Sequence, residues 1–183
     1  MPFHHLAVAA RDMRAVDVFY NEATGFDLVK VELGKTPTGG WAKHFFYDTG
    51  EGEMMAFWEL HDDTIPDEFP TALSTGIGLP EWVNHIAFKA ADAADMEKRK
   101  QRWLEHGYDV LEIDHRWCYS IYTTDPNGTL VEFCRTTGVF DETDRAKARE
   151  ALVSDDFEFE QAKPNIEFHK AEKEPAHLAS ESA

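Results

Sequence analysis

The segment HLAVAARD at residues 5–12 and the segment HIAFKAAD at residues 85–92 are two copies of one unit. In both copies the first residue is histidine, the third is alanine and the last is aspartate, and His85 follows His5 by 80 residues. A stretch with helical character follows each copy, at 13–24 before Gly25 and at 93–106 before Gly107. The chain therefore contains an internal repeat, and this repeat decides the fold.

Each copy predicts the same order of elements. The opening residues alternate apolar and mixed side chains with a period of two, which is typical of a half-buried strand. Asp12 and Asp92 are suited to cap the helices that follow, and the two glycines are suited to end them. Three strand candidates follow each helix, at 26–33, 41–48 and 53–60 in the first unit and at 108–113, 117–124 and 129–135 in the second. The pattern is βαβββ, twice.

Two four-stranded units with one apolar face each bury those faces economically when they lie side by side. We therefore expect an α+β fold in which two βαβββ modules form an open eight-stranded barrel around a cavity, with the helices outside. The expected boundaries are a first module at 1–62, a linker at 63–82, a second module at 83–136, and an acidic C-terminal helix with a loose tail at 137–183. The C-terminal helix is expected within 141–156.

Composition narrows the class of partner. The formal net charge of the 183 residues is -17, which disfavours nucleic acid and anionic membranes as partners because like charges repel. The chain has no apolar run of about 18 residues and no basic start followed by an apolar stretch, so the sequence predicts a cytoplasmic protein with a small-molecule partner. Cys118 and Cys134 lack the spacing of a zinc motif and are expected to be reduced.

Three residues are candidate metal ligands. Because side chains alternate across a strand, only one of His4 and His5 points inward, and the repeat selects His5, with His85 as its counterpart. A lone strand histidine is more commonly a hydrogen-bonded core residue, but repetition at matched positions favours a ligand. Glu132 lies in the apolar strand TLVEF, where a carboxylate is costly to bury unless it is paired or metal-bound. His5, His85 and Glu132 would form the 2-His-1-carboxylate set typical of non-haem Fe(II) oxygenases.

The paired βαβββ units, the H-x-A strand openings and the DPNGTLVEF ending resemble the vicinal oxygen chelate superfamily from about residue 2 to 136. That superfamily includes glyoxalase I, extradiol ring-cleaving dioxygenases and antibiotic-resistance proteins, so the resemblance implies a fold more sharply than an activity. The segment DHRWCYSIYTTDPNGTLVEF at 114–133 is similar to the signature of type I extradiol dioxygenases, in which a histidine and a tyrosine precede a D-P-x-G turn and the ligand glutamate.

This resemblance implies roles for two further residues. Tyr122 would donate a hydrogen bond to a metal-bound substrate oxygen, and His115 would contact the other hydroxyl or cover the pocket. The implied reaction is ring opening of a catecholic aromatic by O2 at an Fe(II) site. Mn(II) suits the same ligands. A homodimer is also implied by the resemblance alone.

Alternatives stay open at this point. Glu59, in the strand segment FWEL, resembles the fourth ligand of glyoxalase I; as a ligand it would favour a lyase or isomerase that uses Ni(II), Zn(II), Co(II) or Mn(II). A small-molecule or antibiotic binding protein of the same fold is a third reading, and intact ligands argue against it. Larger extradiol enzymes carry a pocket histidine shortly before the second ligand histidine; residues 70–84 contain none, and His61 is the nearest substitute.

Overall fold

The structure, a computed structural model, describes residues 3–156 and 164–179. The first module contains β1 (His5–Ala10), α1 (Met13–Asp17), a π-helical turn (Val18–Ala23), β2 (Asp27–Lys35), β3 (Trp41–Gly50) and β4 (Glu53–His61). After a linker with one 3-10 turn (Thr75–Ile77), the second module contains β5 (His85–Lys89), α2 (Ala93–Glu105), β6 (Val110–Asp114), β7 (Cys118–Thr124) and β8 (Leu130–Thr136). The C-terminal region adds α3 (Glu142–Val153), β9 (Asn165–His169) and α4 (Ala176–Ala179). The βαβββ pattern is confirmed in both modules.

Local chemistry explains where the helices begin and end. The Asp12 carboxylate accepts hydrogen bonds from the amides of Arg14 and Ala15, and the Asp92 carboxylate accepts one from Asp95, so both aspartates are N-caps as predicted. Gly25 and Gly107 follow the two helices with φ of 84° and 91°, a conformation that favours glycine. The first helical stretch runs from Met13 to Ala23 and is π-helical from Val18 onward.

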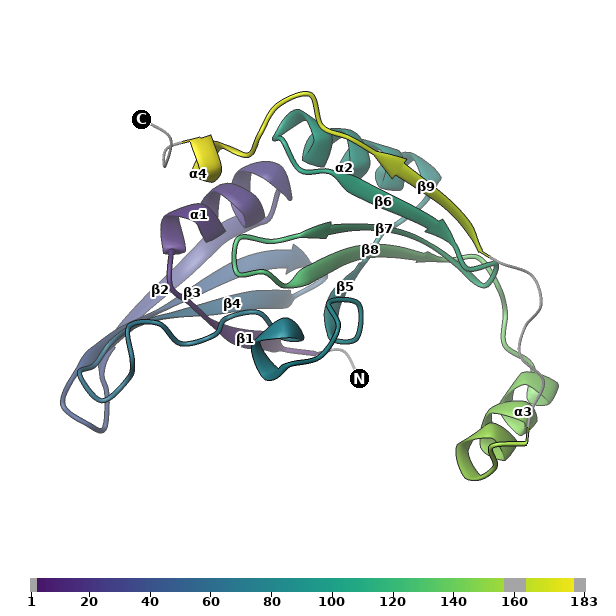
Figure 1. Cartoon of the computed structure of the whole chain (residues 1–183), viewed down its shortest axis with the longest axis horizontal. Helices are drawn as coiled ribbons and strands as arrows, with labels where there is room; N and C mark the ends of the chain where they lie inside the picture. The colour runs from purple at the N-terminus through teal and green to yellow at the C-terminus, as the bar shows by residue number, and fades with distance from the viewer. Residues whose placement is uncertain (1–2, 157–163, 180–183) are drawn as a thin grey trace.

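The strands form two separate sheets. The first has the order β1-β4-β3-β2 and the second has the order β5-β8-β7-β6-β9. In each, the first strand is parallel to the last strand of its module and the other neighbours are antiparallel. Both helices lie on the same side of the two sheets (Figure 1). The sheets do not close into a barrel, so β1 and β5 remain sheet edges in the described chain.

The core lies between the helices and the sheets and joins the two modules. Phe19 of the first module stacks on Trp103 of the second at 6.3 Å between ring centroids. The Trp103 indole donates a hydrogen bond of 3.1 Å to the buried Thr24 hydroxyl. The Tyr20 hydroxyl donates one of 2.9 Å to Asp125, in the turn between β7 and β8. These contacts hold the modules together through their helix side.

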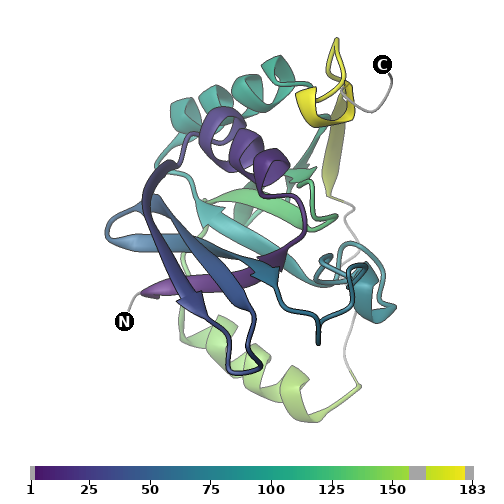
Figure 2. The same cartoon turned by 90° about the vertical axis from the view of Figure 1, so that its left-hand side faces the viewer.

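The prediction of a loose tail is wrong for residues 165–169. Residues 165–169 pair antiparallel with β6 as a fifth strand, from Val110 opposite His169 to Asp114 opposite Asn165. The physical reason is that β6 is otherwise an edge strand whose backbone groups lack partners, and an extended segment satisfies them. The predicted helix is confirmed as α3, which has no buried residue and projects from the body (Figures 1 and 2). No helix in the described residues is long and apolar enough to span a membrane.

Candidate metal centre and active site

The strand register assigns every candidate ligand to one face of its sheet. Side chains two apart on a strand share a face, and so do residues directly opposite on neighbouring strands. Buried Met55, Phe57 and Val131 mark the face that packs against the helices. We call the other face of each sheet the far face; it carries His5 in the first sheet, and His85, Tyr122 and Glu132 in the second.

On the far face of the second sheet, four predicted residues form a line of contacts. The His85 Nε2 atom lies 3.1 Å from a Glu132 carboxylate oxygen, and the Glu132 side chain is only 6% exposed. Tyr122 lies opposite Glu132 on the neighbouring strand, and its ring is 6.2 Å from that of His85. The Tyr122 hydroxyl and His115 Nε2 are 3.0 Å apart and share a hydrogen bond. The contacts explain how the buried Glu132 carboxylate is tolerated.

The environment keeps Tyr122 protonated. Burial raises the pKa of its phenol well above the usual value, and the nearby Glu132 carboxylate raises it further because a second negative charge would be repelled. A protonated phenol beside two candidate metal ligands is placed to donate a hydrogen bond to an oxygen atom bound there.

On the first sheet, His5 lies at the start of edge strand β1 and is exposed. Its Nδ1 atom is 2.7 Å from Nδ1 of His4, and its ring packs against Phe46 and His44 at 5.6 Å and 6.0 Å between centroids. His44 was not singled out from the sequence. It is buried, stacks on Trp58 at 3.7 Å, and its Nε2 atom has no hydrogen-bond partner among the residues that the structure describes. A histidine in the apolar segment WAKHFF was the signal for it.

Glu59 points to the other side of the sheet from His5. It follows Trp58, which shares the far face with His44, so alternation turns the Glu59 side chain toward the helix side. There it accepts hydrogen bonds from Lys43 at 2.9 Å, and it contacts His61 Nε2 at 2.6 Å. These two partners lower the pKa of the Glu59 carboxyl against the opposing effect of its burial. His61 is engaged with Glu59 and stacks on Trp41.

The two sheets can be superimposed in register. His5 lies opposite Met54 and His85 lies opposite Leu130. Two residues further along, the place that holds Glu132 in the second sheet holds Ala56 in the first. The first sheet therefore retains the histidine of the repeated site but lacks a carboxylate at the matching position.

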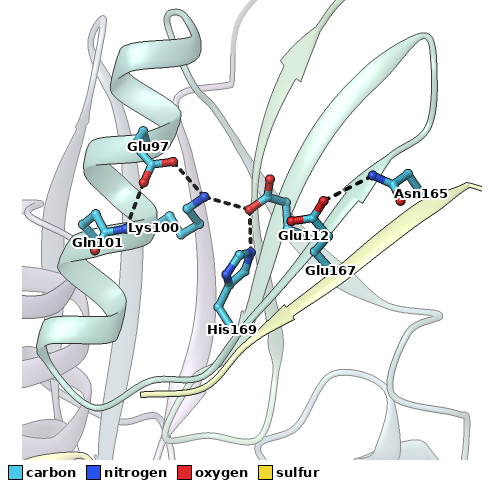
Figure 3. Close-up of polar contacts among 7 residues, drawn as sticks. All are labelled: Glu97, Lys100, Gln101, Glu112, Asn165, Glu167 and His169. Carbon is cyan, nitrogen blue, oxygen red and sulfur yellow. Dashed lines mark hydrogen bonds and ion pairs between the residues drawn. The ribbon is translucent and has the colours of Figure 1, made fainter. Parts of the chain in front are cut away.

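In the single chain, the three predicted ligands are not gathered around one point. Among residues 3–156 and 164–179, one group of three His, Cys, Asp or Glu side chains has ligand atoms within 4.8 Å of one another, and it consists of Glu112, Glu167 and His169. This group, a possible set of metal ligands, lies between α2, β6 and β9 (Figure 3). The Lys100 ammonium group is already 2.9 Å from Glu112 and 2.7 Å from Glu97, so the charge of the buried carboxylate has a partner without a metal. His5, His85 and Glu132 would meet only if the sheets approached or a second copy supplied the missing side.

The donor set on the far faces nevertheless suits a divalent metal. Two neutral imidazoles and a carboxylate are the ligand types that first-row divalent ions prefer in oxygenases. Glu132 is buried with a histidine as its close partner, an arrangement that a cation would stabilise further. Both histidines open edge strands, so their rings are reachable from outside the sheet.

The family model described as Glyoxalase/Bleomycin resistance protein/Dioxygenase superfamily matches residues 3–133. The chain belongs to this superfamily. Solved structures agree with the fold. A glyoxalase/bleomycin resistance protein/dioxygenase domain from Frankia sp. EAN1pec is 13% identical with a TM-score of 0.55, and the match covers 74% of this chain and 98% of that one. TnmS3, an antibiotic binding protein from Streptomyces sp. CB03234, is 16% identical with a TM-score of 0.51, covering 75% and 97%.

A lactoylglutathione lyase from Agrobacterium tumefaciens is 25% identical with a TM-score of 0.47, and the match covers 73% of this chain and 92% of that one. No curated protein matches the chain significantly. The family model matches up to residue 133, so α3, β9 and α4 lie outside the matched residues.

Proposed function

We propose that the protein is an Fe(II)-dependent extradiol-type dioxygenase that cleaves a catecholic aromatic with O2. The observation that carries this proposal is Ala56 in the place that matches Glu132, together with Glu59 turned to the helix side and paired with Lys43. A set of two histidines and one carboxylate leaves more metal positions open for substrate and oxygen than a set of two histidines and two carboxylates. The larger set suits a lyase or isomerase.

Each residue then has a role. His5, His85 and Glu132 would hold the iron, which would offer a place to bind both hydroxyls of the diol and would relay electrons from the diol ring to O2. Mn(II) would suit the same ligands, and Ni(II) or Zn(II) would favour the lyase alternative. Tyr122 would donate its hydrogen bond to one substrate oxygen, and His115, 3.0 Å from the Tyr122 hydroxyl, would accept the proton that the diol loses on binding.

We further propose that the working unit is a homodimer. On the far face of the first sheet, Trp58 is 37% exposed on the same side as the exposed His5, so one chain leaves this face partly uncovered. A second copy that covers this sheet would bring its own His85 and Glu132 toward His5 and so complete the ligand set. The location in the cytoplasm stays a prediction from the sequence.

The test is metal analysis of anaerobically purified protein, followed by oxygen uptake on addition of catechols. Iron near one equivalent per chain and catechol-dependent uptake are expected, with both lost in Glu132→Gln. Glu59→Gln is the matched control, since the same change is made on the helix side of the other sheet, and it should keep iron and uptake. Bound nickel or zinc without uptake, or loss of metal in Glu59→Gln, would contradict the proposal and favour the lyase alternative. Tight binding of a diol without turnover would favour a binding protein.

A further inference from the structure

We propose that the C-terminal segment from β9 to Pro175 forms one wall of the substrate pocket and selects catechols that carry a bulky, uncharged apolar substituent. The substrate class rests on the proposed function, whereas the wall itself rests on the structure of a segment outside the region shared with the superfamily.

A cavity of about 750 Å³ opens beside the candidate site. Leu111, Tyr122 and Leu130 line it from the far face of the second sheet, and Phe168 and residues 170–175 line it from the C-terminal segment. Tyr122 lies opposite Glu132, and Leu130 lies opposite His85. The cavity is therefore adjacent to the two ligands that already contact each other.

The size of the cavity sets the size of the ligand. Pockets for drug-sized ligands span roughly 300–1,000 Å³, and a single diol ring would fill only a small part of such a space. Phe168 lines the remaining space and is 64% exposed, although it is a large apolar residue on a strand. An apolar substituent on the diol ring would cover this side chain and gain its burial energy.

The charges on the rim favour an uncharged substituent. Lys170 and Lys173 face the cavity together with Glu172 and Glu174, and Asp109 adds a further negative charge. The acidic side chains thus outnumber the two lysines, so the rim offers no net attraction to a carboxylate on the ligand.

The segment is firmly attached, as a pocket wall must be. All five residues of β9 are in register with β6. On the helix side, His169 Nε2 lies 2.8 Å from Glu112, in the network that also includes Lys100 (Figure 3). Beyond β9, the amide of Ala171 donates a 2.7 Å hydrogen bond to Asp109. A Cβ on Gly107 would lie only 2.5 Å from the backbone of Glu174, so the segment packs directly against this glycine.

Side chains along β9 alternate between the two faces of the sheet, and the two faces have different roles. His169 points to the helix side and fixes the strand, while Phe168 points to the far face and lines the cavity. Ile166 shares the far face with Phe168 and is 56% exposed, but it does not line the cavity. Ile166 is therefore a matched control for Phe168.

The experiment measures anaerobic binding of catechol and 4-tert-butylcatechol to the iron-loaded, full-length protein by calorimetry. The wild type should prefer the substituted diol, and Phe168→Ala should reduce this preference about tenfold, as for a lost apolar contact in a specificity pocket. Ile166→Ala should leave the preference unchanged. Equal effects of the two variants, or no effect of Phe168→Ala, would overturn the proposal that the C-terminal segment forms a wall of the pocket.

A second measurement separates this inference from the dioxygenase proposal. If neither diol binds, the proposed function has failed, and the wall is judged by fluorescence titration with the uncharged aromatic probe N-phenyl-1-naphthylamine. Weaker binding of the probe in Phe168→Ala than in Ile166→Ala would support the C-terminal segment as a pocket wall for an apolar ligand other than a diol. Identical titrations of the two variants would refute it. Circular dichroism of both variants confirms that each is folded.

Discussion

Ala56 in the first sheet occupies the place that Glu132 has in the second, two residues beyond the partner of the repeated histidine in each case. The two modules are thus alike in backbone and unlike in chemistry. His85 has a carboxylate 3.1 Å away, whereas the nearest ring neighbours of His5 are His4, His44 and Phe46. His5 can complete a ligand set only with the carboxylate of the other sheet, in the same chain or in a second copy.

Hybrid dimers distinguish these two sources. His5→Ala and Glu132→Ala are co-expressed with different affinity tags, and the hybrid is purified through both tags. If each site takes His5 from one copy and Glu132 from the other, the hybrid has one intact site and one doubly changed site, so it should show about half of the wild-type oxygen uptake.

Each variant alone should be inactive and is the control for carry-over. A hybrid without uptake would mean that the three ligands of a site belong to one chain, and the sheets would then have to approach each other within that chain.

Tyr122→Phe tests the hydrogen bond donor. The variant removes only the hydroxyl that lies 3.0 Å from His115, so the fold should persist. Loss of a positioned proton donor typically costs about 10²–10⁴-fold in rate, and we expect a fall of kcat in this range with iron retained. Tyr119→Phe is the control, because Tyr119 lies on the opposite face of β7. Equal kcat values for the two variants would exclude the role of Tyr122.

Much of the fold could be predicted because its signals are local. The caps at Asp12 and Asp92 and the stops at Gly25 and Gly107 depend on a few neighbouring residues, and strand alternation is visible in each copy of the repeat. The contacts of His85 with Glu132 and of Tyr122 with His115 are also within reach of sequence reasoning, since all four residues lie within one module.

The remaining features depend on long-range packing. Whether two sheets close into a barrel depends on how the modules dock, and no short motif encodes that. The pairing of β9 with β6 joins residues from Asp114 and Asn165 to Val110 and His169, which are 51 to 59 positions apart in the sequence. The alternation of Ile166 and Phe168 in NIEFH was nevertheless a visible signal for a strand. The sequence alone left open which face of the sheet Glu59 points to, because a register shift of one residue moves every side chain of a strand to the other face. The pairing register in the structure resolved it.

Tyr20 should link stability to alkaline pH. Its buried hydroxyl donates to Asp125 of the other module, and burial first, then the Asp125 carboxylate, raises the pKa of Tyr20 well above 10.0. The unfolded chain loses this proton near pH 10 while the folded chain keeps it. The stabilisation is therefore complete below pH 10 and falls as the pH rises further, by about 1.4 kcal/mol per pH unit for one such group.

Urea unfolding at pH 8, 10 and 11 measures this effect. Tyr20→Phe should be less stable than the wild type at pH 8 by about 1–3 kcal/mol, because it removes a buried hydrogen bond and leaves a carboxylate with fewer donors. Above pH 10 its free energy of unfolding should fall less steeply than that of the wild type. Parallel curves for the two proteins would show that Tyr20 titrates alike in both states.

His169 should control how often β9 detaches. The His169 ring contacts the Glu112 carboxylate, so His169→Ala removes one hydrogen bond to a carboxylate. The five-residue backbone pairing of β9 with β6 remains. A loss of about 1–2 kcal/mol corresponds to about 5- to 30-fold more frequent opening. Hydrogen exchange of the amides in 165–169 should accelerate by this factor, and exchange in β3 should not change.

Glu167→Ala is the matched control, since Glu167 lies on the same face of β9 but accepts a hydrogen bond only from Asn165 among the contacts drawn in Figure 3. Unchanged exchange in His169→Ala would mean that backbone pairing alone retains the strand, and equal acceleration in both variants would mean that the contact with Glu112 has no specific part in holding the pocket wall in place.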